Sequence, residues 1–326
     1  MSSLVSRFSK LLCLLAALAA VPCAAQAQAY PSRPLTIIVP YAAGGSLDAV
    51  TRILAKSMTT RLGQTVLVEN KAGAGSNIGA AYVAKSPPDG YTLFLASPAT
   101  AINVSLYSQL SYDPEKDLAP VSLVTAVPSV LIVPASSPYK SVAELVTFAK
   151  ANPGKLNYSS GGAGSSEHLG SEMFKFYCGV DVTHIPYKGG APAMTDLMAG
   201  QVSMMFSNRI GALPHIRSGK LRALGVADSV RSPQLPDVPT FVEAGYPDLK
   251  VLVWSGIMAP AGTPPAVLNR LHAVITESMQ ASDMKAQMDE MGVTIASGGP
   301  KEFGEFLRRE IALWRPIVKQ SGARVD

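Results

Sequence analysis

Apolar runs of strand length alternate along the chain with stretches in which apolar residues recur at helical spacing. The first pair shows the pattern: LTIIVP (35–40) predicts a strand, and the stripe that starts at Leu47 predicts a helix ended by Gly63. Further strands are predicted at 65–69, 91–96, 156–160, 182–186, 202–206 and 221–227. Further helices are predicted at 77–85, from 141, at 166–177, 193–199 and 210–218, and from about 265 and 300. This alternation predicts an α/β fold with mainly parallel sheets flanked by helices.

Two apolar runs are longer than the rest, at 121–134 and 252–260. We interpret them as crossovers between two lobes. The first lobe is then predicted to comprise residues 30–128 and 255–326, and the second lobe, 129–254, is inserted in it. A cleft between such lobes is a usual ligand site. The stretch 99–120 shows no regular pattern, and we expect it to be irregular.

The first 29 residues have the features of a secretory signal peptide. Arg7 and Lys10 give a positive start, LLCLLAALAAV (11–21) is an apolar run, and AQAQA (25–29) offers small residues at cleavage spacing. The apolar run is short for a membrane anchor, the alternative interpretation. We therefore expect a mature protein that begins near Tyr30, is soluble and is exported.

Composition excludes several classes of function. The net charge of +5 falls to +3 without Arg7 and Lys10, only 16% of residues are charged, and basic residues form no run, which argues against nucleic acid. Of three Cys, only Cys178 follows the signal peptide, and its apolar neighbours predict a buried thiol. Cys and His show no metal-ligand spacing, so neither a metal nor a cofactor is expected.

Five connections between a predicted strand and the following helix are small, rich in Gly and Ser, and nearly uncharged. They are YAAGGS (41–46), SPAT (97–100), SSGGAGSS (159–166), YKGGAPA (187–193) and SNRIG (207–211). In an open parallel sheet, such connections lie at the carboxyl ends of the strands, where ligands bind. The first amides of each helix are unpaired donors with a partial positive charge, and Gly allows close approach. We therefore expect them to hold a small dianion without any arginine, with candidate contacts at Ser46, Ser97, Thr100 and Asn208, and with Arg209 as a further candidate that has two interpretations.

Asp48 and Arg209 each allow two interpretations. Asp48 falls in a first helical turn, where a carboxylate complements the helix dipole, but it could also accept from a ligand amine. Arg209 follows a predicted strand and starts a helix. It either grips a second carboxylate of the ligand or points to solvent and pairs with a surface acid.

Two enzyme-like interpretations fail on motif spacing. GAGSNIG (73–79) departs from the dinucleotide-binding fingerprint, and no acid ends the next predicted strand. Ser165 and Ser166 stand near His168, but the G-x-S-x-G elbow of hydrolases is absent. We expect His168 to be solvated or to cap a helix, and we predict no catalytic residue and no enzyme activity.

The chain resembles the substrate-binding proteins of tripartite tricarboxylate transporters, also called the Bordetella uptake gene (Bug) family. The motifs that carry this resemblance are VPYAAGGSLDAVTRILA (39–55), LGQTVLVENKAGAGSNIGA (62–80), PPDGYTL (87–93), HIPYKGGAPAMTDLMAGQV (184–202) and GKLRALGV (219–226). The resemblance runs from about Tyr30 to the C-terminus and implies a two-lobed periplasmic protein, a Venus flytrap, that closes on a small carboxylate.

The same resemblance implies site residues, ligands and partners. It places ligand contacts at Ala43, Gly44, Gly45, Asp48, Ser165, Ser166, Gly189, Gly190 and Ala191. Implied ligands are dicarboxylates, acidic amino acids or aromatic acids, held largely by main-chain amides. The implied partners are the membrane subunits of the transporter, and the protein is expected to be a monomer. A periplasmic sensor that partners a signalling protein is the alternative function.

Overall fold

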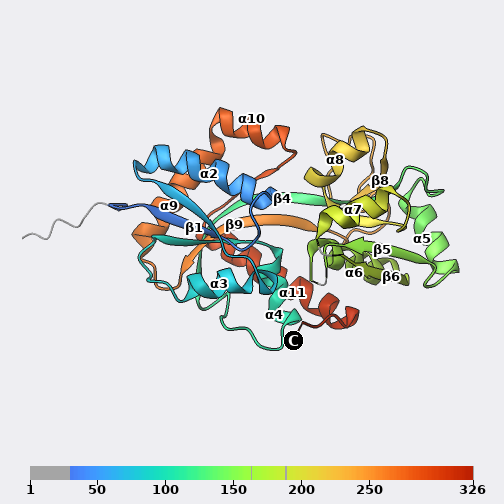
Figure 1. The fold of residues 1–326 in the computed structure, drawn as a ribbon, viewed down its shortest axis with the longest axis horizontal. Coiled ribbons are helices and arrows are strands. Elements are labelled where there is room, and N and C mark those ends of the chain that lie inside the picture. The colour runs from blue at the N-terminus through green and yellow to red at the C-terminus, as the bar shows by residue number, and fades with distance from the viewer. Residues whose placement is uncertain (1–29, 163, 188, 326) are drawn as a thin grey trace, which may run out of the picture. The chain divides into compact units, whose positions relative to one another are not determined.

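The computed structural model describes residues 30–162, 164–187 and 189–325. The predicted signal peptide, residues 1–29, lies outside these ranges. Contacts divide the chain after Ser32, and the fold below is that of the unit Arg33–Asp326 (Figure 1). None of the helices in the described ranges is long and apolar enough to cross a membrane.

Strands and helices alternate through most of this unit, as the apolar pattern predicts. The strands are β1 (Leu35–Val39), β2 (Val66–Asn70), β3 (Thr92–Ala96), β4 (Leu118–Pro134), β5 (Leu156–Ser160), β6 (Val182–Pro186), β7 (Met205–Asn208), β8 (Leu221–Val226), β9 (Leu252–Pro260) and β10 (Ile295–Gly298). The helices are α2 (Ser46–Leu62), the 3₁₀ turn η1 (Ala74–Ser76), α3 (Asn77–Ala84), α4 (Pro98–Leu106), α5 (Val142–Ala151), α6 (Ser166–Cys178), α7 (Gly190–Met198), α8 (Arg209–Arg217), α9 (Pro265–Gln280), α10 (Ser282–Glu290) and α11 (Pro300–Ser321).

The first lobe is built on strands in the order β10-β4-β9-β3-β1-β2. β1 runs parallel to β2 and β3, whereas β9 pairs antiparallel with β3 and β4. The second lobe joins the far part of β4 to β7 and β8, again antiparallel, and contains the parallel pair β5–β6. The α/β class with two lobes is confirmed. The expected parallel pairing holds for β1–β3 and β5–β6, but the long strands make the sheets mixed.

The long strand β4 belongs to both lobes, as expected of a crossover. Its residues from Leu118 to Pro128 pair with β9, and those from Ser129 to Pro134 pair with β7 and β8. β9 returns alongside it, with Leu252 opposite Pro128. β4 thus changes its pairing partners after Pro128. The lobe boundaries themselves stay a prediction.

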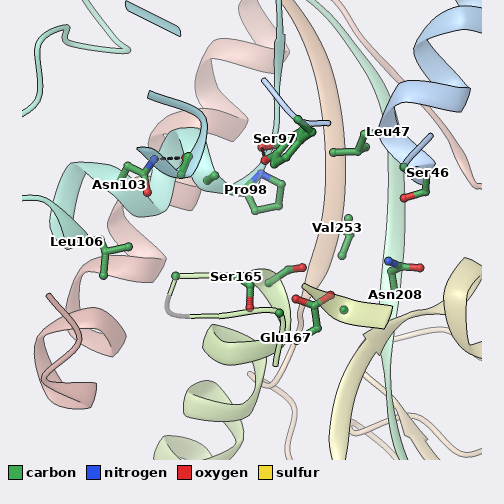
Figure 2. A pocket seen from close by; sticks show the side chains of 18 of the residues that line it. Ser46, Leu47, Ser97, Pro98, Asn103, Leu106, Ser165, Glu167, Asn208 and Val253 are labelled. Carbon is green, nitrogen blue, oxygen red and sulfur yellow. Dashed lines mark hydrogen bonds between the residues drawn. The ribbon is translucent and has the colours of Figure 1, made fainter. Parts of the chain in front are cut away.

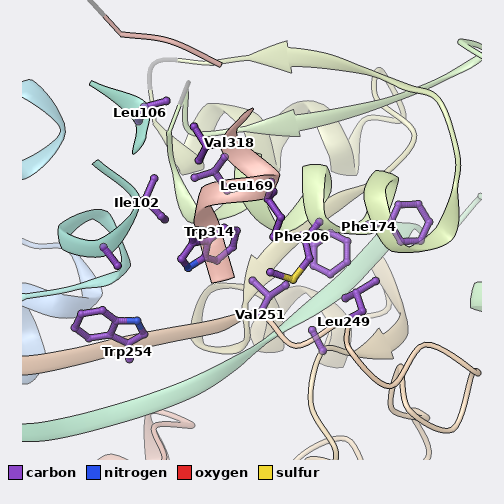
Figure 3. Close-up of a cluster of buried hydrophobic side chains, with 14 of the residues drawn as sticks. Ile102, Leu106, Leu169, Phe174, Phe206, Leu249, Val251, Trp254, Trp314 and Val318 are labelled. Atoms are coloured by element: carbon purple, nitrogen blue, oxygen red, sulfur yellow. The ribbon is translucent and has the colours of Figure 1, made fainter. Parts of the chain in front are cut away.

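The C-terminal helix α11 closes a core that side chains of both lobes share (Figure 3). Trp314 on α11 lies buried in this core with Trp254 of β9 and Phe206 of β7. Both indole nitrogens donate to Oε2 of Glu310, at 2.8 Å from Trp254 and 3.2 Å from Trp314. Burial raises the pKa of the Glu310 carboxyl, although the two indole hydrogen bonds oppose this. These contacts tie α11 to the crossover strand β9.

The sequence predictions fail at three places. The stretch 99–120 contains α4, whose Ala101, Ile102 and Leu106 are buried. Its apolar stripe was hidden because Thr, Asn and Ser, which compete for backbone hydrogen bonds, interrupt it. β7 begins at Met205 rather than at 202, and the short elements α10 and β10 were not anticipated.

Candidate ligand-binding site

A cavity of about 490 Å³ lies between the two lobes (Figure 2). Each of the five Gly- and Ser-rich connections contributes to its wall. The wall residues from these connections are Tyr41, Gly45, Ser46, Ser97, Pro98, Ala99, Gly161, Gly164, Ser165, Ser166, Gly190 and Asn208. All five connections therefore meet around one cavity, as expected.

Five helix starts surround the cavity. The residues that precede or cap them are Gly45 for α2, Ser97 for α4, Ser165 for α6, Gly189 for α7 and Asn208 for α8. The first amides of a helix have no acceptor within it, and they carry the positive end of the helix dipole. The wall thus offers main-chain donors from both lobes to a negatively charged group.

The α2 start is shaped by Asp48 and its partners. The Asp48 carboxylate accepts from the Gly44 amide at 2.9 Å, from Arg52 Nε at 3.0 Å and from Asn70 Nδ2 at 2.9 Å. Gly44 adopts a φ of +89°, a conformation that favours Gly. The Arg52 hydrogen bond, followed by those from Gly44 and Asn70, lowers the pKa of Asp48 to about 2 against the effect of burial.

These contacts favour a structural role for Asp48, the first of its two interpretations. It borders the cavity, but its oxygens are occupied by donors of the protein itself. The Gly44 amide is likewise used internally, so the free donors of this start are the amides at the beginning of α2. Gly45, in contrast, has an extended conformation and contributes directly to the wall.

The α4 start is held by side-chain hydrogen bonds. The hydroxyls of Tyr41 and Ser97 are 2.6 Å apart, and the Ser97 amide donates to Thr100 Oγ1 at 3.2 Å. Burial raises the pKa of Tyr41. Thr100 is fully buried and holds this turn from behind rather than lining the cavity.

Two histidines support the loop before α6. His168 Nδ1 accepts from the Gly164 amide at 3.1 Å, and the His168 amide donates to Ser165 Oγ at 3.2 Å. The His168 ring stacks on His184 with ring centres 4.2 Å apart. Burial, then the neighbouring His184, lowers the pKa of His168 to about 3. His168 is thus buried and neutral. It is not solvated, but its ring does satisfy a backbone amide at the start of α6, the second of the two roles expected from the sequence.

One Ser–His contact is present but is closed to substrates. Ser160 Oγ lies 2.6 Å from His184 Nε2, yet Ser160 is fully buried and does not border the cavity. The same hydroxyl accepts from the Gly162 amide at 3.1 Å. This pair holds the loop in place, and its burial gives no access to a substrate.

Arg209 does not reach the cavity. Only 3% of it is exposed, and its guanidinium donates to Ser232 Oγ, Gly292 O and Thr294 Oγ1 at 2.9, 2.9 and 3.2 Å. Burial lowers its pKa. Both sequence interpretations of Arg209 are corrected here, because it neither faces the cavity nor lies at the surface. It connects the start of α8 to the segment before β10.

Eight of the fourteen predicted site residues border the cavity, and six do not. The six outside are Ala43, Gly44, Thr100, Gly189, Ala191 and Arg209. Ligand contact by any of the fourteen stays a prediction. Sequence reasoning missed wall residues of two kinds. Some follow a predicted contact by one or two positions in the first turn of a helix, and others come from η1, α4 and β9. They are Leu47, Glu167, Gly75, Asn103, Leu106, Tyr107 and Val253.

An α/β fold of two lobes around a cavity lined by helix starts defines a solute-binding protein. The chain belongs to the family described as the tripartite tricarboxylate transporter family receptor (TctC), whose sequence profile matches residues 50–323. Family and structural neighbours are solute-binding proteins and not enzymes.

Individual relatives agree with this assignment. Protein BugT of Bordetella pertussis is 39% identical over 311 residues, which cover 95% of each chain. A protein of R. palustris solved with adipate has a TM-score of 0.81 at 34% identity, covering 91% of this chain and 100% of its own. MatC of Rhodopseudomonas palustris, solved with bound malate, has a TM-score of 0.78 at 33% identity, covering 89% of this chain and 100% of its own.

Proposed function

We propose that this protein captures a small carboxylate reversibly in the cavity between its lobes and passes it to the membrane subunits of a tripartite tricarboxylate-type transporter. The observation that carries the proposal is the meeting of five helix starts in one cavity wall. Their free amides suit an anion that is bound and released unchanged. The carboxylates seen in two structural neighbours, adipate and malate, support this class of ligand.

The proposed route to this role begins with export. The basic residues, short apolar run and small residues of the first 29 positions suit cleavage by a signal peptidase and release into the periplasm. There the protein acts as a monomer that closes on its ligand. A sensor that partners a signalling protein would use the same cavity, so the two roles differ only in the protein that recognises the closed form.

A thermal-shift screen against a panel of carboxylic acids tests the proposal. A ligand that binds only the folded state at a hundred times its Kd stabilises the protein by about 2.7 kcal/mol. We expect at least one acid to raise the Tm, while its uncharged amide does not. A complete panel without a hit, or turnover of the bound acid by pure protein, would contradict the proposal. Loss of uptake of the identified acid after gene deletion would separate transport from sensing.

A further inference from the structure

Glu167 places a carboxylate in the cavity wall of the second lobe (Figure 2). It is the second residue of α6, and its two oxygens lie beside Gly161, in the connection that leads into α6, and Gly190, the first residue of α7. A β-carbon built on Gly161 would stand 3.6 Å from Oε2, and one built on Gly190 would stand 3.7 Å from Oε1. Because both neighbours are Gly, neither brings a side chain against this carboxylate.

The two acidic residues of the wall differ in their partners. Asp48 is paired with Arg52 and accepts two further hydrogen bonds. Within the described part of the chain, no group donates a hydrogen bond to the Glu167 carboxylate, and no cation forms an ion pair with it. None of the described residues that line the cavity is Lys or Arg. The wall therefore keeps one negative charge that the described residues do not compensate.

This charge acts across the cavity on the first lobe. The Glu167 carboxylate contributes to the raised pKa of Tyr41, behind the larger effect of burial. Tyr41 lies with Ser97 at the α4 start, next to the α2 start. The first lobe thus offers the free amides at the start of α2, whereas the second lobe adds a carboxylate to the starts of α6, α7 and α8.

A ligand with two carboxylates fits this arrangement poorly. One carboxylate would find the amides of the first lobe, but the other would approach the like charge of Glu167. A protonated amine at the second end would instead find an acceptor already in place, and charge-assisted hydrogen bonds of this type are among the stronger ones. The wall thus favours a ligand with a negative and a positive end.

We propose that Glu167 is a specificity-determining residue that selects a ligand with a carboxylate at one end and a protonated amine at the other. The carboxylate lies on the start of α2, and the amine donates to Glu167. This inference rests on the proposed function, because it assumes that the cavity binds a carboxylate. It narrows that function to a zwitterionic amino acid instead of a simple diacid.

Calorimetry with matched pairs of acids tests the inference. Each pair has the same number of carbon atoms: succinate with γ-aminobutyrate, glutarate with δ-aminovalerate, and adipate with ε-aminocaproate. For at least one pair, we expect the wild-type protein to bind the amino acid at least tenfold more tightly than the diacid. Glu167→Gln should remove at least tenfold of this preference, since the amide keeps the shape of the side chain but loses its charge.

Glu144→Gln is the matched control. Glu144 also lies in the first turn of a helix, α5, but it caps its own turn by accepting from the Lys140 amide and does not border the cavity. This variant should keep the wild-type preference. If the acid that raises the Tm most is not one of these six compounds, its affinity is compared with that of the matching compound that has an amine in place of the second carboxylate, or the reverse.

The outcomes separate the two proposals. A wild-type preference for diacids, or a preference for amino acids that survives in Glu167→Gln, would overturn the role of Glu167 and leave carboxylate binding intact. Failure of every carboxylic acid to bind would overturn the proposed function and the inference together.

Discussion

Asp48→Asn should destabilise the protein because it removes the negative charge that accepts the hydrogen bonds at the start of α2. The carboxylate is 3% exposed and accepts hydrogen bonds from Gly44, Arg52 and Asn70. Asn keeps the shape but replaces one accepting oxygen with an NH₂ donor, which would face a donor in any orientation. Hydrogen bonds to a charged group contribute about 1.5–3 kcal/mol.

The lowered pKa gives a second measure of the same effect. The pKa of Asp48 falls from 3.8 to about 2, chiefly through Arg52. At about 1.4 kcal/mol per unit, this corresponds to roughly 2 kcal/mol of stability at neutral pH. The sign follows from the direction of the shift: the contribution is complete above the unfolded-state pKa, near pH 4, and is lost as the pH falls through about 2.

Urea denaturation of the wild type and Asp48→Asn, at pH 7 and at pH 3, checks this reasoning. We expect a difference of about 2 kcal/mol in unfolding free energy at pH 7 and roughly half of it at pH 3. Asp283→Asn is the control, because Asp283 lies exposed in the first turn of α10. It should cost less than about 1 kcal/mol. Equal differences at both pH values would refute the account of Asp48.

Three further predictions concern binding and the contact between lobes. Gly45→Val should weaken carboxylate binding tenfold or more, about 1.4 kcal/mol by calorimetry. The variant should still fold, because Gly45 has an extended backbone and a β-carbon there would meet only Ala42 O at 3.8 Å. Unchanged affinity would exclude the start of α2 as the anion site. Arg209→Ala should lower the unfolding free energy by about 1–3 kcal/mol, since it leaves Gly292 O without its buried donor. If the variant instead keeps its stability and loses affinity for diacids alone, Arg209 belongs to the binding site. Ligand should reduce the radius of gyration in small-angle X-ray scattering, because each lobe carries only some of the helix starts; an identical value at proven saturation would indicate a rigid pocket.

The fold could be predicted where one physical signal dominated a segment. The β1–α2 unit was predicted almost to the residue because a strongly apolar strand, a helical stripe and the left-handed Gly63 all agree. The helix α4 was missed because its polar residues are buried for tertiary reasons. Asn103, for example, is 1% exposed and donates to Gly75 O and Asn77 Oδ1. These partners are distant in the sequence, so a local pattern cannot predict them.

In the candidate site, too, local features could be predicted from the sequence and tertiary contacts could not. Helix starts are local features, so the five connections could be found from the predicted strands and helices together with their Gly and Ser content. The direction of a side chain is set by its neighbours, and there the sequence was insufficient. Arg209 was expected in the cleft or at the surface, but Ser232, Gly292 and Thr294 hold it inside. Glu167 was not among the predicted site residues because its position beside Gly190 depends on how α6 and α7 lie in the fold.

A wall made of helix starts has an evolutionary consequence. Every residue except Pro carries an amide hydrogen, so most substitutions in these first turns leave the anion-binding groups in place. Affinity for a carboxylate is then robust to mutation, whereas the few side chains that enter the cavity remain free to vary. A duplicated gene could acquire a new ligand by changing one such side chain without rebuilding its main-chain donors.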